Sequence, residues 1–223
     1  MAAPLIQLIH AVRVAERPIH DAFSRLWPEA RTDDFTDGAL ATDLEAAGAL
    51  TDAFTGRMEG LIGRGVEAGA DAVLFTCSAF GGAIEQARAK VEIPVLKPDE
   101  AMIDEALSRS EGRNSRIGGL ATFAPTIGSL SSELAVAAQA RGLTPEITLR
   151  HVPGAMEALN DGREAEHDRL IAQAAEDLAD VDVLMLAQFS MVRARDAIAD
   201  VPGRSVLTAP DEAVKKLKGL LAE

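Results

Sequence analysis

The sequence predicts an α/β protein of two pseudo-symmetric lobes, each a mostly parallel sheet flanked by helices. One observation is an internal echo: Asp71 leads an apolar run that ends at Cys77, and Asp182 leads a similar run that ends at Gln188, in both cases six residues later. The other is that apolar runs of strand length alternate with segments of helical periodicity. This alternation is typical of parallel sheets that are covered by helices on both faces.

A second echo supports the same period. Residues 98–101 and 210–213 both read Pro-Asp-Glu-Ala and are 112 residues apart, while Cys77 and Gln188 are 111 residues apart. A period of about half the chain indicates two similar α/β units, because the repeats of a solenoid span only roughly 20 to 50 residues. We therefore expect lobe 1 to comprise residues 1–97 and 208–223 and lobe 2 to comprise residues 98–207. The functional site is expected in the cleft between them.

Lobe 1 is expected to open with a strand at 5–12, after which the sequence to about residue 50 has no clear pattern and Asp33-Asp34 is interpreted as part of a solvated loop. Thr51 suits the N-cap of a helix whose apolar residues recur at helical spacing, and Gly69 suits the end of that helix. The expected elements that follow are a strand at 71–77, a helix at 83–90, a strand at 93–96 and a helix from residue 99.

Lobe 2 is expected to repeat this alternation. The same reasoning predicts, in order, a strand at 116–122, a helix to about 141, a strand at 146–151, a long helix at 164–180 and a strand that begins at 182. A short strand at 206–207 and an amphipathic helix at 211–220 are expected to follow.

Composition limits the expected partners. The formal net charge is −13 and the basic residues are scattered, which disfavours binding to nucleic acid or to an anionic membrane. The N-terminal apolar run is too short to cross a bilayer. A single cysteine permits no intramolecular disulfide and fits a reducing, cytoplasmic location.

No metal or nucleotide cofactor is expected from the motifs. The sequence has no zinc-spaced Cys/His cluster and no phosphate-binding loop. Gly63 and Gly65 have the spacing of a dinucleotide fingerprint, but they fall inside a predicted helix instead of after a strand. We therefore interpret them as a close-packing patch.

Cys77 is the leading catalytic candidate. It lies between Thr76 and Ser78 at the end of a predicted strand, which is where open α/β sheets place their sites. The backbone N–H groups of Ser78 and Ala79 at a helix N-terminus would face a bound carboxylate, and would lower the thiol pKa from ~8.5 to roughly 3.5–7.5. The alternative is a buried cysteine that serves as a small hydrophobe.

Four segments together resemble the aspartate/glutamate/hydantoin racemase superfamily: Thr76-Cys77-Ser78, residues 93–96 (Ile-Pro-Val-Leu), residues 119–122 (Gly-Leu-Ala-Thr) and residues 187–191 (Ala-Gln-Phe-Ser-Met). The resemblance covers most of the chain. It implies a cofactor-free enzyme of two α/β lobes that binds a small carboxylate between them. It also implies that Cys77 is one of the two cysteines that typical members place on opposite sides of the substrate carbon.

The chain departs from this pattern at Gln188, which stands where the second cysteine would be. An amide does not exchange protons at useful rates near neutral pH. Another group must therefore replace the second thiol, or the reaction must need only one. Relatives with one cysteine include arylmalonate decarboxylases, in which the thiol protonates an enediolate.

Further site candidates lie at the ends of lobe 2 strands. Thr122 and Thr126 flank Phe123 and are expected to hold a substrate carboxylate, as the matching Thr-rich loop does in the family, or else to cap the next helix. Gln188 and Ser190 are expected to hydrogen-bond the substrate, although Gln188 could instead satisfy backbone groups.

Histidines supply the remaining acid–base candidates. His10 ends the first strand and could line the cleft as a replacement acid or base, the alternative being a surface histidine. His151 ends a lobe 2 strand and is a weaker candidate. His20 and His167 lie in helical stretches and are expected to be solvated.

The sequence therefore favours a cofactor-independent isomerase or racemase that acts beside the carboxylate or carbonyl of an amino acid or derivative through Cys77. A decarboxylase or C–N hydrolase that uses Cys77 as proton donor or nucleophile is the second interpretation. A noncatalytic protein that binds small carboxylates is the third. The oligomeric state is left open, with a homodimer among the possibilities.

Overall fold

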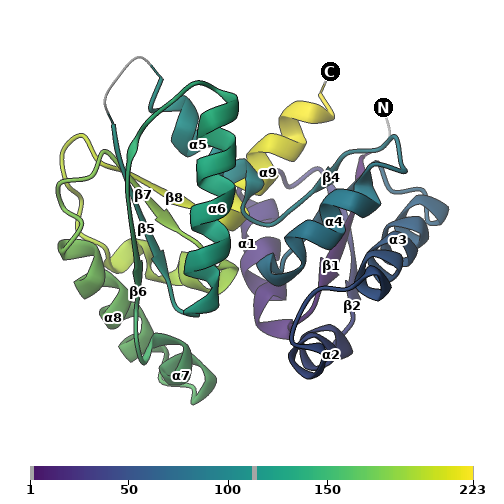
Figure 1. Cartoon of the computed structure of the whole chain (residues 1–223), viewed down its shortest axis with the longest axis horizontal. Helices are drawn as coiled ribbons and strands as arrows, with labels where there is room; N and C mark the ends of the chain where they lie inside the picture. Colours follow the sequence, from purple (N-terminus) through teal and green to yellow (C-terminus); the bar gives the residue numbers. More distant parts are fainter. Residues whose placement is uncertain (1–2, 112–114, 223) are drawn as a thin grey trace. The chain divides into compact units, whose positions relative to one another are not determined.

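The computed structural model describes residues 3–111 and 115–222. The chain divides into two compact units, residues 1–100 with 213–223 (unit 1) and residues 101–212 (unit 2). Each unit contains one four-stranded parallel sheet, with strand order β2-β1-β3-β4 in unit 1 and β6-β5-β7-β8 in unit 2 (Figure 1). The predicted fold class is therefore confirmed, and the two sheets share one topology.

The elements of unit 1 are β1 (Leu5–His10), η1 (Arg13–Ala15), α1 (Glu16–Leu26), β2 (Arg31–Thr36), α2 (Ala39–Ala47), α3 (Asp52–Glu67), β3 (Ala72–Phe75), η2 (Ser78–Phe80), α4 (Gly81–Arg88) and β4 (Val95–Leu96). The next elements are α5 (Glu100–Ser108), β5 (Arg116–Ala121), α6 (Pro125–Ala140), β6 (Glu146–His151), α7 (Ala155–Asn160), α8 (Glu164–Glu176), β7 (Val183–Leu186), η3 (Phe189–Ala197) and β8 (Ser205–Thr208). The last helix, α9 (Ala209–Leu220), contributes most of its residues to unit 1.

The two echoed aspartates have the same structural task. Asp71 Oδ2 accepts a hydrogen bond of 2.7 Å from the backbone N–H of Leu5, and Asp182 Oδ2 accepts one of 2.8 Å from that of Arg116. Leu5 and Arg116 are the first residues of β1 and β5. Each carboxylate therefore satisfies the first N–H of a central strand, which would otherwise lack a partner.

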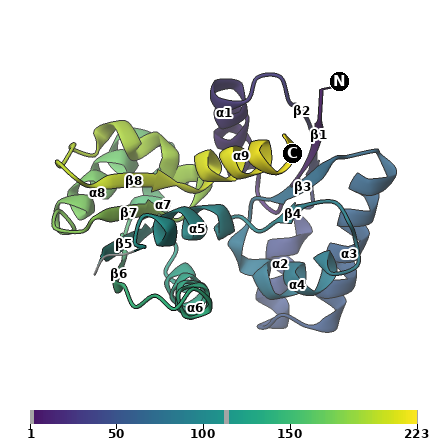
Figure 2. The same cartoon turned by 90° about the horizontal axis from the view of Figure 1, so that it is seen from above.

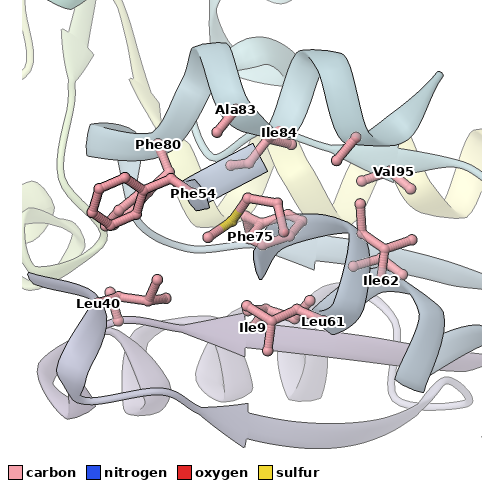
Figure 3. Close-up of a cluster of buried hydrophobic side chains, with 14 residues drawn as sticks. Ile9, Leu40, Phe54, Leu61, Ile62, Phe75, Phe80, Ala83, Ile84 and Val95 are labelled. Atoms are coloured by element: carbon pink, nitrogen blue, oxygen red, sulfur yellow. The ribbon is translucent and has the colours of Figure 1, made fainter. Parts of the chain in front are cut away.

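The core of unit 1 lies between its sheet and three helices. Figure 2 shows α2, α3 and α4 on one face of the sheet and α1 and α9 on the other. The buried cluster drawn in Figure 3 joins the sheet to the first of these layers; it includes Ile9, Phe75, Phe54, Ile62 and Ile84. The Cys77 side chain packs against this cluster, so the sheet and its helices fix the position of the thiol.

The core of unit 2 has the same layered construction. Its buried cluster joins Leu120 and Leu184 of the sheet to Ile171 of α8 and Ala155 of α7. On the other face, a Cβ atom added to Gly119 would lie 3.5 Å from Leu130 of α6. Both faces of the sheet are thus covered by helices, as the near-continuous apolar strands predict.

The sequence analysis assigned no element between residue 12 and about residue 50, where the structure has η1, α1, β2 and α2, and it also missed α7 and the nine-residue 3₁₀ segment η3. β2 is an edge strand with the sequence Arg-Thr-Asp-Asp-Phe-Thr, so its polar residues conceal a strand that pairs in register with β1. The interpretation of Asp33-Asp34 as a solvated loop was therefore wrong. Gly65 lies within α3, and a Cβ atom there would be 3.1 Å from Gln7, so it is a close-packing position as expected. Gly63 lies in the same helix but has nothing within 4 Å of an added Cβ atom, so the expectation was wrong for this residue. Within residues 3–111 and 115–222, no helix has the length and hydrophobicity of a membrane span.

Candidate functional site

Cys77 lies at the carboxyl end of β3, two residues beyond the strand. Its backbone is extended (φ −122°, ψ 120°), and it is the N-cap of the short 3₁₀ helix η2, which runs directly into α4. The thiol is half-buried, while the neighbouring Ala79 is exposed. A hydrogen bond from the Ala79 backbone N–H to the thiol group joins the two. This arrangement places a free thiol beside the backbone amide of an exposed residue.

Burial raises the pKa of the Cys77 thiol above its ordinary value. The hydrogen bond from Ala79 lowers this pKa, but the effect is smaller than that of burial, and the negative charge of the buried Asp99 raises it further. The expectation of a low-pKa thiol was therefore wrong. A single turn of 3₁₀ helix donates one amide to the sulfur, and that does not offset desolvation of the thiolate.

The alkylation rate of Cys77 should therefore rise with pH along a curve whose midpoint lies above the ~8.5 of a free thiol. Only the thiolate reacts, and the raised pKa delays its formation to higher pH. This prediction is tested by measuring the rate of alkylation by iodoacetamide from pH 6 up to the highest pH at which the protein stays folded. The same measurement is made on the folded protein and on the protein unfolded in urea. The curve in urea should return to the free-thiol midpoint; a folded-state midpoint below it would contradict the prediction.

His10 is completely buried, and hydrogen bonds occupy both of its ring nitrogens. Nδ1 lies 2.8 Å from Thr76 Oγ1 and Nε2 lies 2.9 Å from Asp34 Oδ1. An ionised carboxylate only accepts, so Nε2 carries the proton and, in the neutral ring, Nδ1 accepts from the Thr76 hydroxyl. This geometry leaves His10 no ring nitrogen for a substrate. His10 thus contacts Thr76, the residue before Cys77, and the acid–base role expected for His10 stays a prediction.

Asp34 and His20 are partners that the sequence interpretation missed. His20 Nε2 lies 2.9 Å from the same Asp34 Oδ1 atom that holds His10, and Thr32 Oγ1 lies 3.5 Å from His20 Nδ1. His20 is partly exposed, with 39% of its side chain accessible, so it is not simply solvated. The available signal was the period-2 pattern of Thr32, Asp34 and Thr36, which puts three polar side chains on one face of β2.

Asp34→Ala should lower the free energy of unfolding of unit 1 by about 1–3 kcal/mol, because it leaves the buried Nε2–H of His10 without an acceptor. Urea unfolding followed by the fluorescence of Trp27, the single tryptophan, measures this loss in the correct unit. Asp33→Ala is the matched control, since Asp33 is exposed on the same strand. Equal effects of the two substitutions would contradict the role given to Asp34.

In unit 2, Gln188 lies at the position equivalent to Cys77, two residues beyond β7. Its Oε1 accepts a 2.8 Å hydrogen bond from the backbone N–H of Thr122, and its Nε2 donates a 2.9 Å hydrogen bond to Thr126 Oγ1. The structure thus brings together Thr122, Thr126 and Gln188, three of the predicted candidates. It does so by satisfying these polar groups from within the protein.

The other unit 2 candidates differ in exposure. Phe123 is 52% exposed, whereas Ser190 is buried and only 6% exposed. His151 Nε2 lies 3.3 Å from the carbonyl oxygen of Thr122. His167 is completely buried, so the expectation of a solvated side chain was wrong; its Nδ1 lies 2.8 Å from Asp168 Oδ1.

Two local sites therefore result, one in each unit. Unit 1 offers a thiol that can hold or release a proton, the Ala79 amide that bonds to it, and a network in which the buried His10 contacts the buried Thr76 and the exposed Asp34. Unit 2 offers an amide–threonine cluster with no nucleophile. Among the described residues, no group of three or more His, Cys, Asp or Glu side chains could hold a metal ion.

The family model described as Asp/Glu/Hydantoin racemase matches residues 5–217. A comparison with curated proteins finds no significant match.

Solved structures share the fold at low sequence identity. An aspartate racemase homologue from Pyrococcus horikoshii OT3 has a TM-score of 0.73 at 13% identity, covering 100% of both chains. Glutamate racemase from Francisella tularensis, in complex with D-glutamate, has a TM-score of 0.67 at 17% identity and covers 99% of this chain and 81% of its own. Allantoin racemase from Klebsiella pneumoniae has a TM-score of 0.68 at 17% identity, covering 99% and 88% respectively.

Proposed function

Because the chain belongs to the Asp/Glu/Hydantoin racemase family, we propose that it is a cofactor-independent racemase-type enzyme that uses Cys77 for proton transfer. Its reaction takes place at the carbon beside the carboxylate or carbonyl of a small molecule. The observation that carries this proposal is the half-buried thiol at the carboxyl end of β3, hydrogen-bonded to the backbone amide of the exposed residue Ala79. The substrate class is a small carboxylate, in keeping with the D-glutamate bound to the Francisella structure.

The raised pKa gives Cys77 a protonated resting state near neutral pH. In the donor step, the S–H proton moves to the substrate carbon, the carbanion electron pair forms the new C–H bond and the sulfur becomes a thiolate. The Ala79 N–H then faces a full negative charge, and hydrogen bonds to charged groups are the stronger ones. In the reverse step the thiolate removes the proton from the same face of the carbon.

The Thr76–His10–Asp34 network supports this chemistry by fixing the segment that carries the thiol. Thr76 Oγ1 contacts His10 and also lies 3.4 Å from the carbonyl oxygen of Ile9. His10 is therefore a positioning residue for Thr76.

Cofactor-free decarboxylation is the second candidate, and the protonated state of the Cys77 thiol near neutral pH favours it. Loss of CO₂ leaves the C–C bond electrons on the substrate as an enediolate, which needs one proton on one face. A protonated Cys77 supplies that proton, and solvent returns one to the thiolate. Gln188, the counterpart of Cys77 in unit 2, has an amide that supplies none at a useful rate near neutral pH.

Incubation in D₂O with dicarboxylic amino acids, hydantoins and arylmalonates tests these proposals together. Racemisation incorporates deuterium with loss of chirality, decarboxylation releases CO₂ with one deuterium added, and C–N hydrolysis opens the hydantoin ring. Exchange or racemisation of at least one substrate is the expected result. Saturable binding of carboxylates without any of these reactions would overturn the enzymatic proposal in favour of a binding protein.

A further inference from the structure

Asp99 lies beside Cys77 at the carboxyl edge of the unit 1 sheet. β3 and β4 are parallel neighbours in which Leu74 pairs with Leu96. Cys77 follows Leu74 by three residues and Asp99 follows Leu96 by three residues, so both occupy the same position beyond two strands that run about 4.8 Å apart. Asp99 is only 3% exposed. Its carboxylate is therefore a neighbour of the thiol that solvent scarcely reaches.

The surrounding charged groups make other contacts. On the side of β1, the hydrogen bonds of His10 go to Thr76 and Asp34. Around the end of β4, the printed sequence contributes three cations and two carboxylates that form ion pairs with one another: Arg88 with Glu100 at 2.6 Å, Lys97 with Glu85 at 3.5 Å and Lys216 with Glu100 at 3.7 Å. The charged side chain that acts on the Cys77 thiol is Asp99, which raises the pKa of the thiol.

The carboxylate decides which form of the thiol is populated. A thiolate at Cys77 places a second negative charge next to Asp99, and like charges at neighbouring positions disfavour the ionised form of the weaker acid. Racemisation begins when a thiolate removes the proton of the substrate carbon, whereas decarboxylation uses the thiol as a proton donor. The carboxylate therefore favours the second use.

We propose that Asp99 is a positioning residue that holds Cys77 in its protonated form and thereby commits it to donating a proton to the substrate carbon. The S–H proton passes to that carbon, whose electron pair forms the new C–H bond, and solvent returns a proton to the thiolate. This inference rests on the proposed function for the acid–base role of Cys77. It adds the group that selects proton donation over proton removal.

The test measures the rate of alkylation by iodoacetamide against pH in Asp99→Asn. Asn keeps the shape of the side chain and is as good an N-cap as Asp at this position directly before α5, but it carries no charge. The midpoint of the curve should fall by roughly one pH unit, which makes alkylation about tenfold faster at pH 7, while the plateau rate at high pH stays unchanged. Asp52→Asn is the matched control, since Asp52 is an exposed carboxylate in the first turn of α3, and its midpoint should equal that of the wild type.

The role of Asp99 would be overturned by an unchanged midpoint in folded Asp99→Asn, or by an equal shift in Asp52→Asn. Faster alkylation at every pH with an unchanged midpoint would also overturn it, because Asp99 would then only pack against the segment that carries the thiol. If Asp99→Asn does not fold, Asp99→Ser replaces it in the same measurement, since Ser is also neutral and also suits an N-cap.

A second measurement separates this inference from the proposed function. With a substrate identified in D₂O, Asp99→Asn should speed exchange of the substrate α-proton at pH 7 and should lower the pH at which proton donation declines. Absence of turnover on every substrate would count against the proposed function, and the alkylation curve would still decide the role of Asp99. An unmoved midpoint together with turnover that needs Cys77 would overturn the role of Asp99 alone.

Discussion

Cys77→Ala is expected to reduce turnover by at least 10²–10⁴-fold, the usual contribution of one positioned acid–base group. Substrate affinity should stay within about tenfold, roughly 1.4 kcal/mol, because the amides of Ser78 and Ala79 remain in place and the lost thiol acts on the transition state. Steady-state kinetics on the substrate identified in D₂O, together with direct binding by calorimetry, separate the two effects.

Cys77→Ser is the matched control for this substitution. It keeps a polar group of similar size beside the Ala79 N–H, but the hydroxyl does not ionise near neutral pH. Loss of turnover in both variants, with wild-type unfolding curves, would assign the effect to the thiol and not to a cavity. Turnover retained at the wild-type rate in Cys77→Ala would contradict the assignment of Cys77 as the proton-transferring residue.

Phe80→Ala is expected to lower the free energy of unfolding of unit 1 by about 3–5 kcal/mol, the range for a fully buried aromatic. Phe80 is 2% exposed, lies in η2 three residues after Cys77 and packs on Phe54 with ring centroids 5.8 Å apart (Figure 3). Urea unfolding followed by Trp27 fluorescence reports on this unit. The substitution should also speed alkylation of Cys77, because the cavity loosens the turn that holds the thiol.

Phe123→Ala provides the comparison for Phe80→Ala. Phe123 also follows a central strand, but it is 52% exposed, so its removal should change stability by no more than about 0.5 kcal/mol. A large decrease in the free energy of unfolding in Phe123→Ala, or a small decrease in Phe80→Ala, would contradict the contribution to stability that we assign to the buried cluster.

The sequence predicted the central strands β3 and β7, and it also predicted the edge strand β6 with the bounds that the structure has. β3 and β7 are fully buried four-residue apolar runs, and their leading aspartates both bond the first N–H of the neighbouring strand, so pattern and structure agree. The edge strand β2 was not predicted. Its polar side chains face the histidines of β1 and α1, and a segment without apolar residues at strand spacing is interpreted as a loop.

The candidate site residues were selected because they follow predicted strands, and their roles stay predictions. The strands of a parallel sheet end at one edge, which places His10 and Cys77 at that edge in unit 1 and Thr122 and Gln188 at that edge in unit 2. The sequence did not reveal that His10 uses both ring nitrogens or that Gln188 turns back on Thr122. Both outcomes depend on contacts between residues 24 to 66 positions apart, which no local pattern encodes.

The discontinuity of unit 1 sets an order on folding during synthesis. Unit 2 is one uninterrupted segment, so its sheet can be completed while the chain is still being made, whereas unit 1 lacks residues 213–223 until the end. Those residues bring the buried Val214 and Leu217, and Lys218 donates to the carbonyl oxygen of Leu26 at the end of α1. Unit 1, whose first strands are translated before unit 2, is therefore completed after unit 2. Until α9 is in place, one face of the unit 1 sheet is incompletely covered and can bind chaperones or aggregate.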